Sequence, residues 1–327
     1  MKKNKLAVVA FGGNALLRGN QIGTIEEQEA NTADTMNNIL YLIEEGYDLI
    51  LAHGNGPQVG NILMRNDAGE KTYGIPQMPM DVAVADSQGS IGYMLERALR
   101  NVLLKKGIEK EIITMVTQVI VDKNDPAFNN PTKRVGKIYT KEDADKLATE
   151  KGWRFKEEVK ANGGFRRVVP SPKPIDFMNS KTVNQLAREG KIVITVGGGG
   201  IPVYYDENNQ LRPLEAVIDK DLASAMVGRK VRADEFYILT DVPYVYINYK
   251  KPDEKKLEFL NHADATKLLK EGQFAEGSMA PKIQAALYFI EGGGKMSVIT
   301  EATKLEDMSY GTKITMEYES GTRITQI

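Results

Sequence analysis

Three short apolar segments in this chain each run directly into a cluster of glycines. The segments span residues 5–11, 48–52 and 191–196, and the clusters that follow are Gly12 and Gly13, Gly54 and Gly56, and Gly197 to Gly200. Short apolar runs that end at glycine predict buried strands followed by tight turns. The pattern is typical of a protein in which buried strands alternate with helices.

Glycine matters in these turns because it lacks a Cβ atom. The backbone can therefore adopt positive φ values and bring its N–H groups close to a ligand. If each turn also opens a helix, those N–H groups lie at the positive end of a helix dipole, where phosphate binds well. Ligands of open α/β sheets bind outside the carboxyl ends of the strands, where all three turns would lie. The turns together predict one anion site; the alternative is that they only connect strands to helices and bind nothing.

Helical and strand patterns alternate along most of the chain. Thr24 and Glu27 have the spacing of a capping box before a helical repeat that ends at Gly46, and Pro57 is suited to a first helical position. Further helices are predicted at residues 81–106, 221–227, 263–269 and 281–291, and further strands at residues 111–121, 235–240 and 296–300. This alternation predicts a mostly parallel sheet covered on both faces, a three-layer α/β/α sandwich.

The composition excludes several classes of protein and site. With 43 Lys and Arg against 44 Asp and Glu, the net charge is −1, which does not favour nucleic acid or an anionic membrane as a partner. The absence of cysteine excludes a disulfide scaffold, a thiolate nucleophile and a zinc–thiolate cluster, and only His53 and His262 could supply an imidazole. Because no apolar run approaches the ~20 residues that span a bilayer, we expect a soluble cytoplasmic protein.

Residues 122–171 depart from the alternation. Prolines, glycines, charged residues and the only tryptophan, Trp153, replace the long apolar runs. The segment contains 12 Lys and Arg against 8 Asp and Glu, a net charge of +4, which leaves −5 for the rest of the chain. A basic insertion in an otherwise acidic protein suggests a flap that faces an anion, within a single domain of residues 1–327. The alternative is a solvated surface excursion.

Three lysines are candidates for binding phosphate groups. Lys220 lies between Asp219 and Asp221 at a predicted helix start, Lys282 also lies where a helix begins, and Lys133 lies in the basic insertion. The alternative for each is a solvated surface lysine, with Asp219 as an ordinary helix N-cap. Neither the dinucleotide-binding pattern G-x-G-x-x-G nor the P-loop pattern G-x-x-x-x-G-K-[S/T] occurs. Phosphate binding by this chain therefore needs a different arrangement.

Eight short stretches follow one another in order along nearly the whole chain. They are residues 11–15, 53–60, 88–93, 130–133, 169–175, 197–203, 215–221 and 277–282. Together they resemble the signatures of the carbamate kinases, within the amino-acid-kinase fold family. The resemblance implies an open, mainly parallel eight-stranded sheet between helix layers, a protruding flap and a homodimer. It also implies reversible phosphoryl transfer between ATP and carbamate, which gives ADP and carbamoyl phosphate, with Mg²⁺ entering bound to the nucleotide.

The resemblance also implies roles for individual residues. Lys220 and Lys282 would contact the transferred phosphoryl and the nucleotide phosphates, Asp221 would hold both lysines in place, and Lys133 would reach down from the flap. The residues implied to bind substrate and phosphate are Gly12, Gly13, Asn14, Gly54, Asn55, Gly198 and Gly199. Those implied to bind nucleotide are Asp219, Thr240, Asp241, Tyr249 and Met279. We expect His53 to position its neighbours rather than to act as a base.

Two other functions remain open. One is another enzyme of the amino-acid-kinase fold that phosphorylates a carboxylate, although residues 130–133 and the flap argue against it. The other is a nucleotide-binding regulator without catalysis, although the presence of all three lysines with Asp221 argues against it. Carbamate kinase is therefore the primary prediction.

Overall fold

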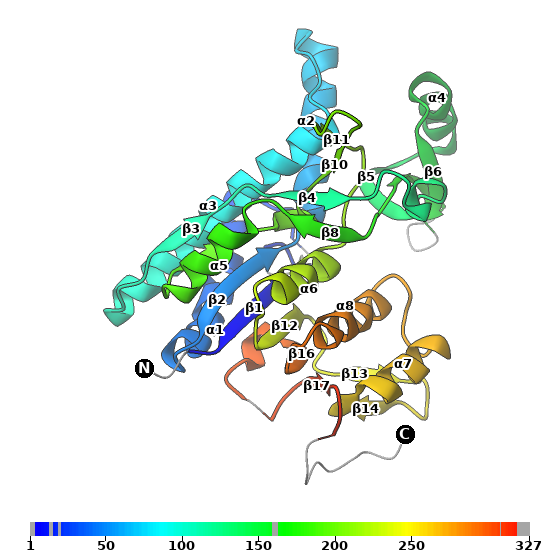
Figure 1. Ribbon diagram of the computed structural model, residues 1–327. Helices are drawn as coiled ribbons and strands as arrows, with labels where there is room; N and C mark the ends of the chain where they lie inside the picture. The colour runs from blue at the N-terminus through cyan, green and yellow to red at the C-terminus, as the bar shows by residue number, and fades with distance from the viewer. Residues whose placement is uncertain (1–3, 13–15, 19–20, 159–162, 308, 319–327) are drawn as a thin grey trace.

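An eight-stranded sheet forms the centre of the molecule, with the strand order β15-β17-β16-β12-β1-β2-β9-β3 (Figure 1). The computed structural model describes residues 4–12, 16–18, 21–158, 163–307 and 309–318. In chain order its strands are β1 (Leu6–Phe11), β2 (Asp48–His53), β3 (Ile112–Thr114), β9 (Ile192–Ile194), β12 (Glu235–Thr240), β15 (Phe259–Asn261), β16 (Met296–Glu301) and β17 (Thr312–Thr315). β17 pairs antiparallel with β16, β15 lies parallel to β17, and the other neighbours pair parallel. The predicted mainly parallel sheet is confirmed.

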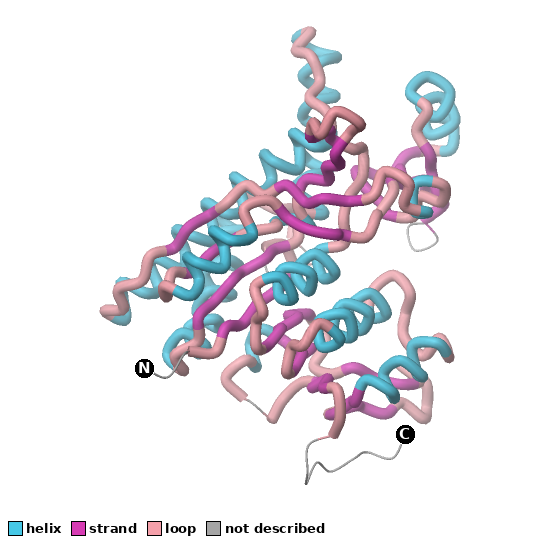
Figure 2. The backbone as a smooth tube through the Cα atoms, viewed as in Figure 1, coloured by secondary structure: helices cyan, strands magenta, loops and turns pink. Residues whose placement is uncertain are grey.

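Helices cover both faces of this sheet, which confirms the three-layer arrangement (Figure 2). α1 (Ile25–Glu44) and α3 (Met80–Lys106) pack on one face, against one set of alternate residues of β1. α5 (Ser180–Arg188), α6 (Lys220–Lys230) and α8 (Met279–Glu291) pack on the other face, against the remaining set. Because successive strand residues point to opposite faces, β1 is buried along its whole length and is apolar throughout.

Local sequence signals marked several helix ends. Thr24 and Glu27 form the predicted capping box at the start of α1: the Thr24 hydroxyl accepts from the Glu27 amide at 3.3 Å, and the Glu27 carboxylate accepts from the Thr24 amide at 3.1 Å. α3 ends at Gly107, whose φ of 66° is the left-handed conformation that glycine adopts easily. α2 (Gly56–Tyr73) begins one residue before Pro57, so this proline occupies the second helical position rather than the first.

The predicted single strand at residues 111–121 is wrong. The chain forms β3 in the main sheet and then β4 (Gln118–Val121), which belongs to a second sheet with the order β11-β10-β4-β8. Between the two strands, the amide of Thr117 donates to the side-chain oxygen of Gln88 on α3 at 2.7 Å. β-branched residues occur in both halves, so strand propensity alone cannot show the change of sheet.

The third glycine cluster does not open a helix. Gly197–Gly199 forms a single 3₁₀ turn, η3, and the chain continues into β10 (Ile201–Tyr205) of the second sheet. Gly198, Gly199 and Gly200 all have positive φ, which folds the backbone tightly before the strand begins. The other strands of this sheet are β8 (Pro174–Phe177) and β11 (Leu211–Pro213).

Residues 133–158 and 163–169 form a small unit beside the main sheet, which we call the β5–β7 unit. It contains β5 (Lys133–Tyr139), α4 (Lys141–Lys151), β6 (Arg154–Glu158) and β7 (Gly164–Val169), with the strand order β5-β7-β6. Figure 1 shows α4 and β6 projecting away from the main sheet. Its buried described residues are Val135, Ala144, Arg167, Val168 and Val169. The unit lies within the segment that the sequence marks as an insertion.

The remaining elements complete the chain. They are η2 (Pro126–Phe128), the hairpin of β13 (Val245–Ile247) and β14 (Lys255–Leu257), α7 (His262–Lys270) and η4 (Ala302–Lys304). Within the described residues, no helix combines the length and the apolar character needed to cross a membrane.

Candidate active site

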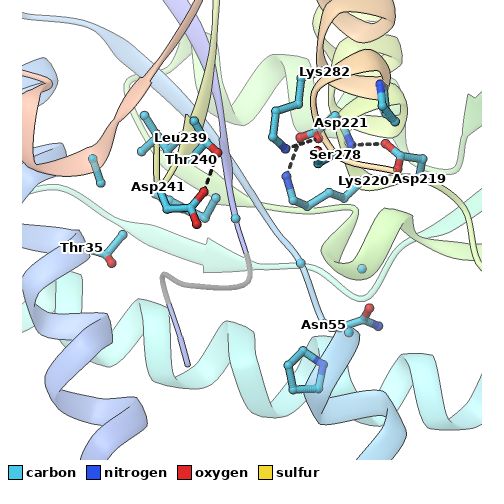
Figure 3. Close-up of a pocket in the computed structure, with 18 of the residues that line it drawn as sticks. Thr35, Asn55, Asp219, Lys220, Asp221, Leu239, Thr240, Asp241, Ser278 and Lys282 are labelled. Carbon is cyan, nitrogen blue, oxygen red and sulfur yellow. Dashed lines mark hydrogen bonds and ion pairs between the residues drawn. The ribbon is translucent and has the colours of Figure 1, made fainter. Parts of the chain in front are cut away.

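A cavity of about 950 Å³ lies at the carboxyl ends of β1, β2 and β12 (Figure 3). The strand register explains its position. Phe11 of β1 pairs with His53 of β2 and with Leu239 of β12, so the segments that follow these three residues are neighbours. Members of all three glycine clusters line the cavity, namely Gly12, Gly54, Gly56 and Gly198. The described parts of the three turns therefore meet at one cleft, as predicted.

Asp221 joins two lysines in this cavity. One of its carboxylate oxygens accepts from Lys220 and the other accepts from Lys282 at 2.9 Å (Figure 3). Lys220 is the first residue of α6, and Lys282 lies in the first turn of α8. The Asp221 residue is only 3% exposed. Two ammonium groups near two helix N-termini favour negative charge in this part of the cavity.

Burial and charge act in opposite directions on the pKa of Asp221. Burial alone would raise it, but the positive charges of Lys220 and Lys282 outweigh burial and hold the pKa below its ordinary value. Burial lowers the pKa of Lys220; the carboxylate of Asp221 opposes this, and the charge of Lys282 adds to it. Asp221 therefore stays ionised at neutral pH and keeps both lysines in place.

A third lysine reaches the cavity from the β5–β7 unit. The Nζ of Lys133 lies 3.0 Å from Oδ2 of Asp219. Oδ1 of Asp219 caps α6, because it accepts from the backbone amides of Asp221 at 2.9 Å and Leu222 at 3.3 Å. This ion pair joins the start of β5 to the helix that begins with Lys220.

The Gly197–Gly200 turn fits into the site only because it has no side chains. A Cβ atom on Gly197 would collide with the imidazole ring of His53. A Cβ atom on Gly198 would collide with the side-chain amide of Asn55, and the φ of Gly198 is +65°. Glycine at these positions therefore allows the third turn to pack against the second.

Two glycine amides that were expected to face a ligand bond to strand ends instead. The amide of Gly12 donates to the carbonyl of Leu239 at 3.1 Å, and the amide of Gly54 donates to the carbonyl of Phe11 at 3.3 Å. These bonds continue the sheet past β1 and β2 and fix the positions of the turns. Both glycines line the cavity, but their amide hydrogens are already used.

Asn55 and His53, on the second turn, are also fixed by neighbours. The side-chain amide of Asn55 donates to the hydroxyl of Ser87 on α3 at 2.9 Å. Nδ1 of His53 lies 3.0 Å from the carbonyl of Gly54, and because a carbonyl only accepts, Nδ1 has the ring proton. Burial, aided by the positive charge of Lys220, lowers the pKa of His53 to about 4. The ring is therefore neutral at neutral pH, as suits a positioning group.

Most of the residues that the sequence selected line this one cavity. They are Gly12, Gly54, Asn55, Lys133, Gly198, Asp219, Lys220, Asp221, Thr240, Asp241 and Lys282. They come from the carboxyl ends of β1, β2 and β12, from the N-termini of α6 and α8, from β5 and from the η3 turn. The site is therefore assembled from segments far apart in the sequence.

The structure does not bring every selected residue to the cavity. Gly199 packs beside the backbone of Ile218. Tyr249 lies with its ring 5.8 Å from that of Tyr246, and Met279 packs against the hydrophobic core. Gly13 and Asn14 lie outside the described residues.

The cavity also contains polar residues that the sequence analysis did not select. They are Arg18, Asp34, Thr35, Asn37, Asn38, Arg134, Ser278, Glu301 and Thr303. Arg18 pairs with Asp34 of α1 at 2.9 Å. Glu301 ends β16, so the rule that ligands lie at the carboxyl ends of strands could have identified it. The α1 residues gave no such signal, because polar residues at helical spacing are also typical of a solvated helix face.

Several carbamate kinases resemble this chain over nearly its whole length. The amino acid kinase family model matches residues 5–301. Carbamate kinase from Thermococcus kodakarensis is 50% identical over 96% of this chain and 100% of that protein, and carbamate kinase from Clostridium perfringens is 44% identical over 98% and 99%. The solved structure of carbamate kinase from Giardia lamblia bound to AMP-PNP has a TM-score of 0.89 and 40% identity over 96% of this chain and 99% of that one. The chain therefore belongs to the amino acid kinase family and, within it, to the carbamate kinases.

Proposed function

We propose that this protein catalyses the reversible transfer of a phosphoryl group between ATP and carbamate. The observation that supports this most is the cluster in which Asp221 joins Lys220 and Lys282 at two helix N-termini in one cavity. Such a cluster offers positive charge to phosphate oxygens. A relative from Giardia lamblia binds AMP-PNP, an analogue of ATP, which supports nucleotide as one of the two substrates.

The chemistry that we propose is direct in-line transfer. In the direction of ATP formation, a β-phosphate oxygen of ADP attacks the phosphorus of carbamoyl phosphate. The bond between phosphorus and the carbamoyl oxygen breaks, and carbamate leaves with the electron pair. Because the attacking oxygen is already anionic, the step needs no general base, which agrees with a neutral, buried His53. The step needs positive charge around the transferred group instead.

In this mechanism the two core lysines stabilise charge and Asp221 positions them. Lys220 and Lys282 would contact the transferred phosphoryl group and the nucleotide phosphates. Asp221 has both oxygens engaged by these lysines, so it fixes their ammonium groups before substrate arrives. Fixed donors need no reorganisation at the moment of transfer, which is the condition under which they accelerate a reaction most.

We propose that Mg²⁺ enters with the nucleotide. Across the residues that the structure describes, no three His, Asp or Glu side chains gather to hold a metal ion. Mg²⁺ at phosphate sites takes most of its ligands from phosphate oxygens and water, so a protein cage is not required. Asp219 lines the cavity beside Lys220, and its Oδ2, which pairs with Lys133 in this structure, is the oxygen that would contact the hydrated ion. Bound there, Mg²⁺ would neutralise phosphate charge.

We further propose that residues 122–171 act as a flap over this cavity. The β5–β7 unit within it has its own sheet, and Lys133 connects that sheet to Asp219. If closure brings Lys133 to the substrate, Lys133→Ala should raise the KM for carbamoyl phosphate, because closure then lacks its charge contact. Steady-state kinetics would test this against Lys141→Ala, which changes a lysine of α4 whose side chain is 73% exposed. An equal KM in the two variants would contradict the role of Lys133.

The working form of the protein that we propose is a cytoplasmic homodimer, as the family resemblance implies. Light scattering coupled to size exclusion would test the dimer, because a single chain has a mass of 36.3 kDa.

A coupled assay tests the proposed reaction directly. Carbamoyl phosphate, ADP and Mg²⁺ are mixed with the protein, and ATP formation is followed with hexokinase and glucose-6-phosphate dehydrogenase. We expect ATP to form with carbamoyl phosphate and not with acetyl phosphate, which presents an ordinary carboxylate leaving group. ATP formation from acetyl phosphate alone would instead support a kinase for carboxylates, and no ATP from either donor would contradict the proposal.

A further inference from the structure

A second cavity, of about 310 Å³, lies between α2 and the β5–β7 unit. Among the described residues, its lining and that of the active-site cavity have only Val135 in common. Leu63 and Met64 of α2, together with Met78 and Val135, provide apolar walls. At roughly 30 Å³ per water molecule, the space corresponds to about ten waters and suits a small organic molecule.

Three hydrogen-bond donors in this cavity have no acceptor among the described residues. The side-chain nitrogen of Asn66 is buried and has no hydrogen-bond partner. Lys137 and Lys151 are exposed and form no ion pair with the described residues; their ammonium groups lie over the rings of Tyr139 at 5.0 Å and Trp153 at 5.1 Å. Only the Asn66 nitrogen is a buried donor without a partner, which is costly, so a molecule that supplies an acceptor to it would be stabilised; the two lysines add positive charge at the solvent-exposed side.

The carboxylates of the cavity are already engaged and cannot satisfy these donors. Asp67 pairs with Lys71 at 2.8 Å. Glu215 pairs with Arg167, which is only 7% exposed and stacks on the ring of Trp153 at 3.9 Å. The charge that remains unpaired in the cavity is therefore positive. An anion with oxygen acceptors matches it.

An irregularity in β5, beside these donors, allows this strand to pack closely against α2. The ladder between β5 and β7 shifts register between Val135 and Ile138, so Gly136 and Lys137 lie in a bulge. Gly60 of α2 packs so closely here that a Cβ atom on it would lie 3.3 Å from the Cα of Gly136. Bulges often direct a side chain towards a functional site, and this one places Lys137 in the cavity wall.

We propose that this cavity binds a small organic carboxylate with an apolar body. Its carboxylate accepts from the Asn66 amide and pairs with Lys137 and Lys151, while its apolar part lies against Leu63, Met64 and Met78. One ligand would then contact α2 on one side and β5 on the other. Binding therefore fixes β5 against α2.

Because the cavity lies next to β5, a ligand bound in it should affect how substrate binds in the active site. This expectation rests on the proposed function. Lys133 begins β5 and reaches Asp219 in the active-site cavity, and Val135, two residues later, lines both cavities. A carboxylate that fixes β5 should lower the KM for carbamoyl phosphate with little change in kcat. By linkage, carbamoyl phosphate should tighten carboxylate binding by the factor by which the carboxylate tightens binding of carbamoyl phosphate.

The single tryptophan of the chain allows binding to be measured without any assay of activity. Trp153 lines the cavity, so its fluorescence should change as a ligand enters. The protein is titrated with hexanoate, and with hexanamide as the probe that keeps the shape but lacks the charge. We expect a saturable change with hexanoate and at least about tenfold weaker binding of hexanamide, because a hydrogen bond to a charged group is lost.

Variants connect the signal to the proposed donors. Asn66→Leu, and separately the double variant Lys137→Gln and Lys151→Gln, should each weaken hexanoate binding about tenfold or more. Lys146→Gln is the matched control, because this lysine of α4 has a side chain that is 68% exposed and does not line the cavity. Circular dichroism confirms that each variant is folded. The Asn66 variant and the lysine variant test the site independently.

Three results would overturn the site: no saturable response to hexanoate, an equal response to hexanamide, or unchanged affinity in both cavity variants. If hexanoate binds but leaves the KM for carbamoyl phosphate unchanged, the coupling to the active site is overturned. If hexanoate binds as expected while no ATP forms from carbamoyl phosphate and ADP, the proposed function fails and the binding site stands.

Discussion

Asp221 shows why the active-site lysines depend on one another. Each of its oxygens is engaged by a lysine, and the three side chains share a buried position at the N-termini of two helices. Breaking such a buried pair leaves an uncompensated charge and usually costs about 3–5 kcal/mol. The cluster has two ammonium groups and one carboxylate, so it can accept a further anion, which the transferred phosphoryl group would supply.

Removal of either core lysine should lower turnover without unfolding the protein. We expect Lys220→Ala and Lys282→Ala each to reduce kcat by ~10²–10³, the usual effect of losing one preorganised donor. Lys230→Ala is the matched control, because this lysine ends the same helix as Lys220 and pairs with Asp176 outside the cavity. The coupled assay gives kcat, and circular dichroism checks the fold. Near-wild-type turnover in Lys220→Ala would refute the proposed site.

His53 should make the stability of the protein depend on pH. Its folded pKa of about 4 lies below the ordinary value of 6.5, so between these values the unfolded chain binds a proton that the folded chain does not. The contribution of His53 to the free energy of unfolding is therefore fully present above pH 6.5 and decreases as the pH drops towards 4. At about 1.4 kcal/mol per pH unit, roughly 2 kcal/mol is lost between pH 6.5 and 5.

Urea unfolding of wild type and His53→Gln at pH 7 and pH 5 measures this effect. We expect the difference in unfolding free energy between the two proteins to move in favour of the variant by roughly 2 kcal/mol at the lower pH. His262→Gln, which removes the other histidine, serves as the control. A difference that does not change with pH would show that His53 does not resist protonation in the fold.

At the scale of elements, the site depends on how closely turns can approach one another. The strand ends of β1, β2 and β12 are bound together by the amides of Gly12 and Gly54. The third turn then packs against the second, with Gly198 against Asn55. Positions in the cavity are therefore set by contacts between turns as much as by the sheet.

Gly198→Ala should affect both stability and turnover, whereas Gly46→Ala should affect only stability. Both glycines have positive φ, and alanine in that conformation costs about 1–2 kcal/mol. Gly46 has no atom within 4 Å of an added Cβ, but a Cβ on Gly198 collides with Asn55. A displaced side chain at a reacting centre can cost ~10²-fold in rate, so we expect such a loss for Gly198→Ala alone. Equal kcat values in the two variants would argue against close packing as the reason for this glycine.

At the scale of the whole molecule, the sequence predicts the central sheet better than it predicts the cavities. Buried strands are marked by apolar runs, and α1 is marked by the capping box of Thr24 and Glu27, because these signals are local. The change of sheet near Thr117 depends on a hydrogen bond to Gln88 on α3, which no local pattern contains. The same is true of the buried nitrogen of Asn66, because its lack of a partner exists only in the folded chain.

Some residues of the candidate site could be predicted from the sequence, and others could not. Lys220, Asp221 and Lys282 could be selected because they begin helices next to glycine clusters and match family signatures. Roles for glycine amides were overestimated, since a sequence does not show that the amide of Gly12 bonds to the neighbouring strand. Arg18 and the polar residues of α1 were missed because their spacing is that of a surface helix.

The uneven burial of side chains predicts that some parts of the molecule unfold locally more easily than others. The strands β1 and β2 are buried along their whole length, whereas β5 and β6 have mostly exposed or half-buried residues and the unit as a whole has few buried side chains. Local opening requires less free energy where few apolar contacts are lost. Amides of residues 133–158 should therefore exchange with deuterium faster than those of β1 and β2 in the protein without ligands. Mass spectrometry of peptides from both regions measures this directly.

Substrates should change exchange in one region and not the other. If the β5–β7 unit closes over the cavity, carbamoyl phosphate with ADP should slow exchange at residues 133–158, because Lys133 and the strand it begins are then held by a bound anion. The central strands should change little, since they are already protected. Lys133→Ala provides the control, and in this variant we expect the ligand-dependent slowing to be smaller although the core exchanges as before. The contrary result is that β5 and β6 exchange as slowly as the central strands without ligand and do not respond to substrates. These residues would then be a fixed part of the core rather than a flap.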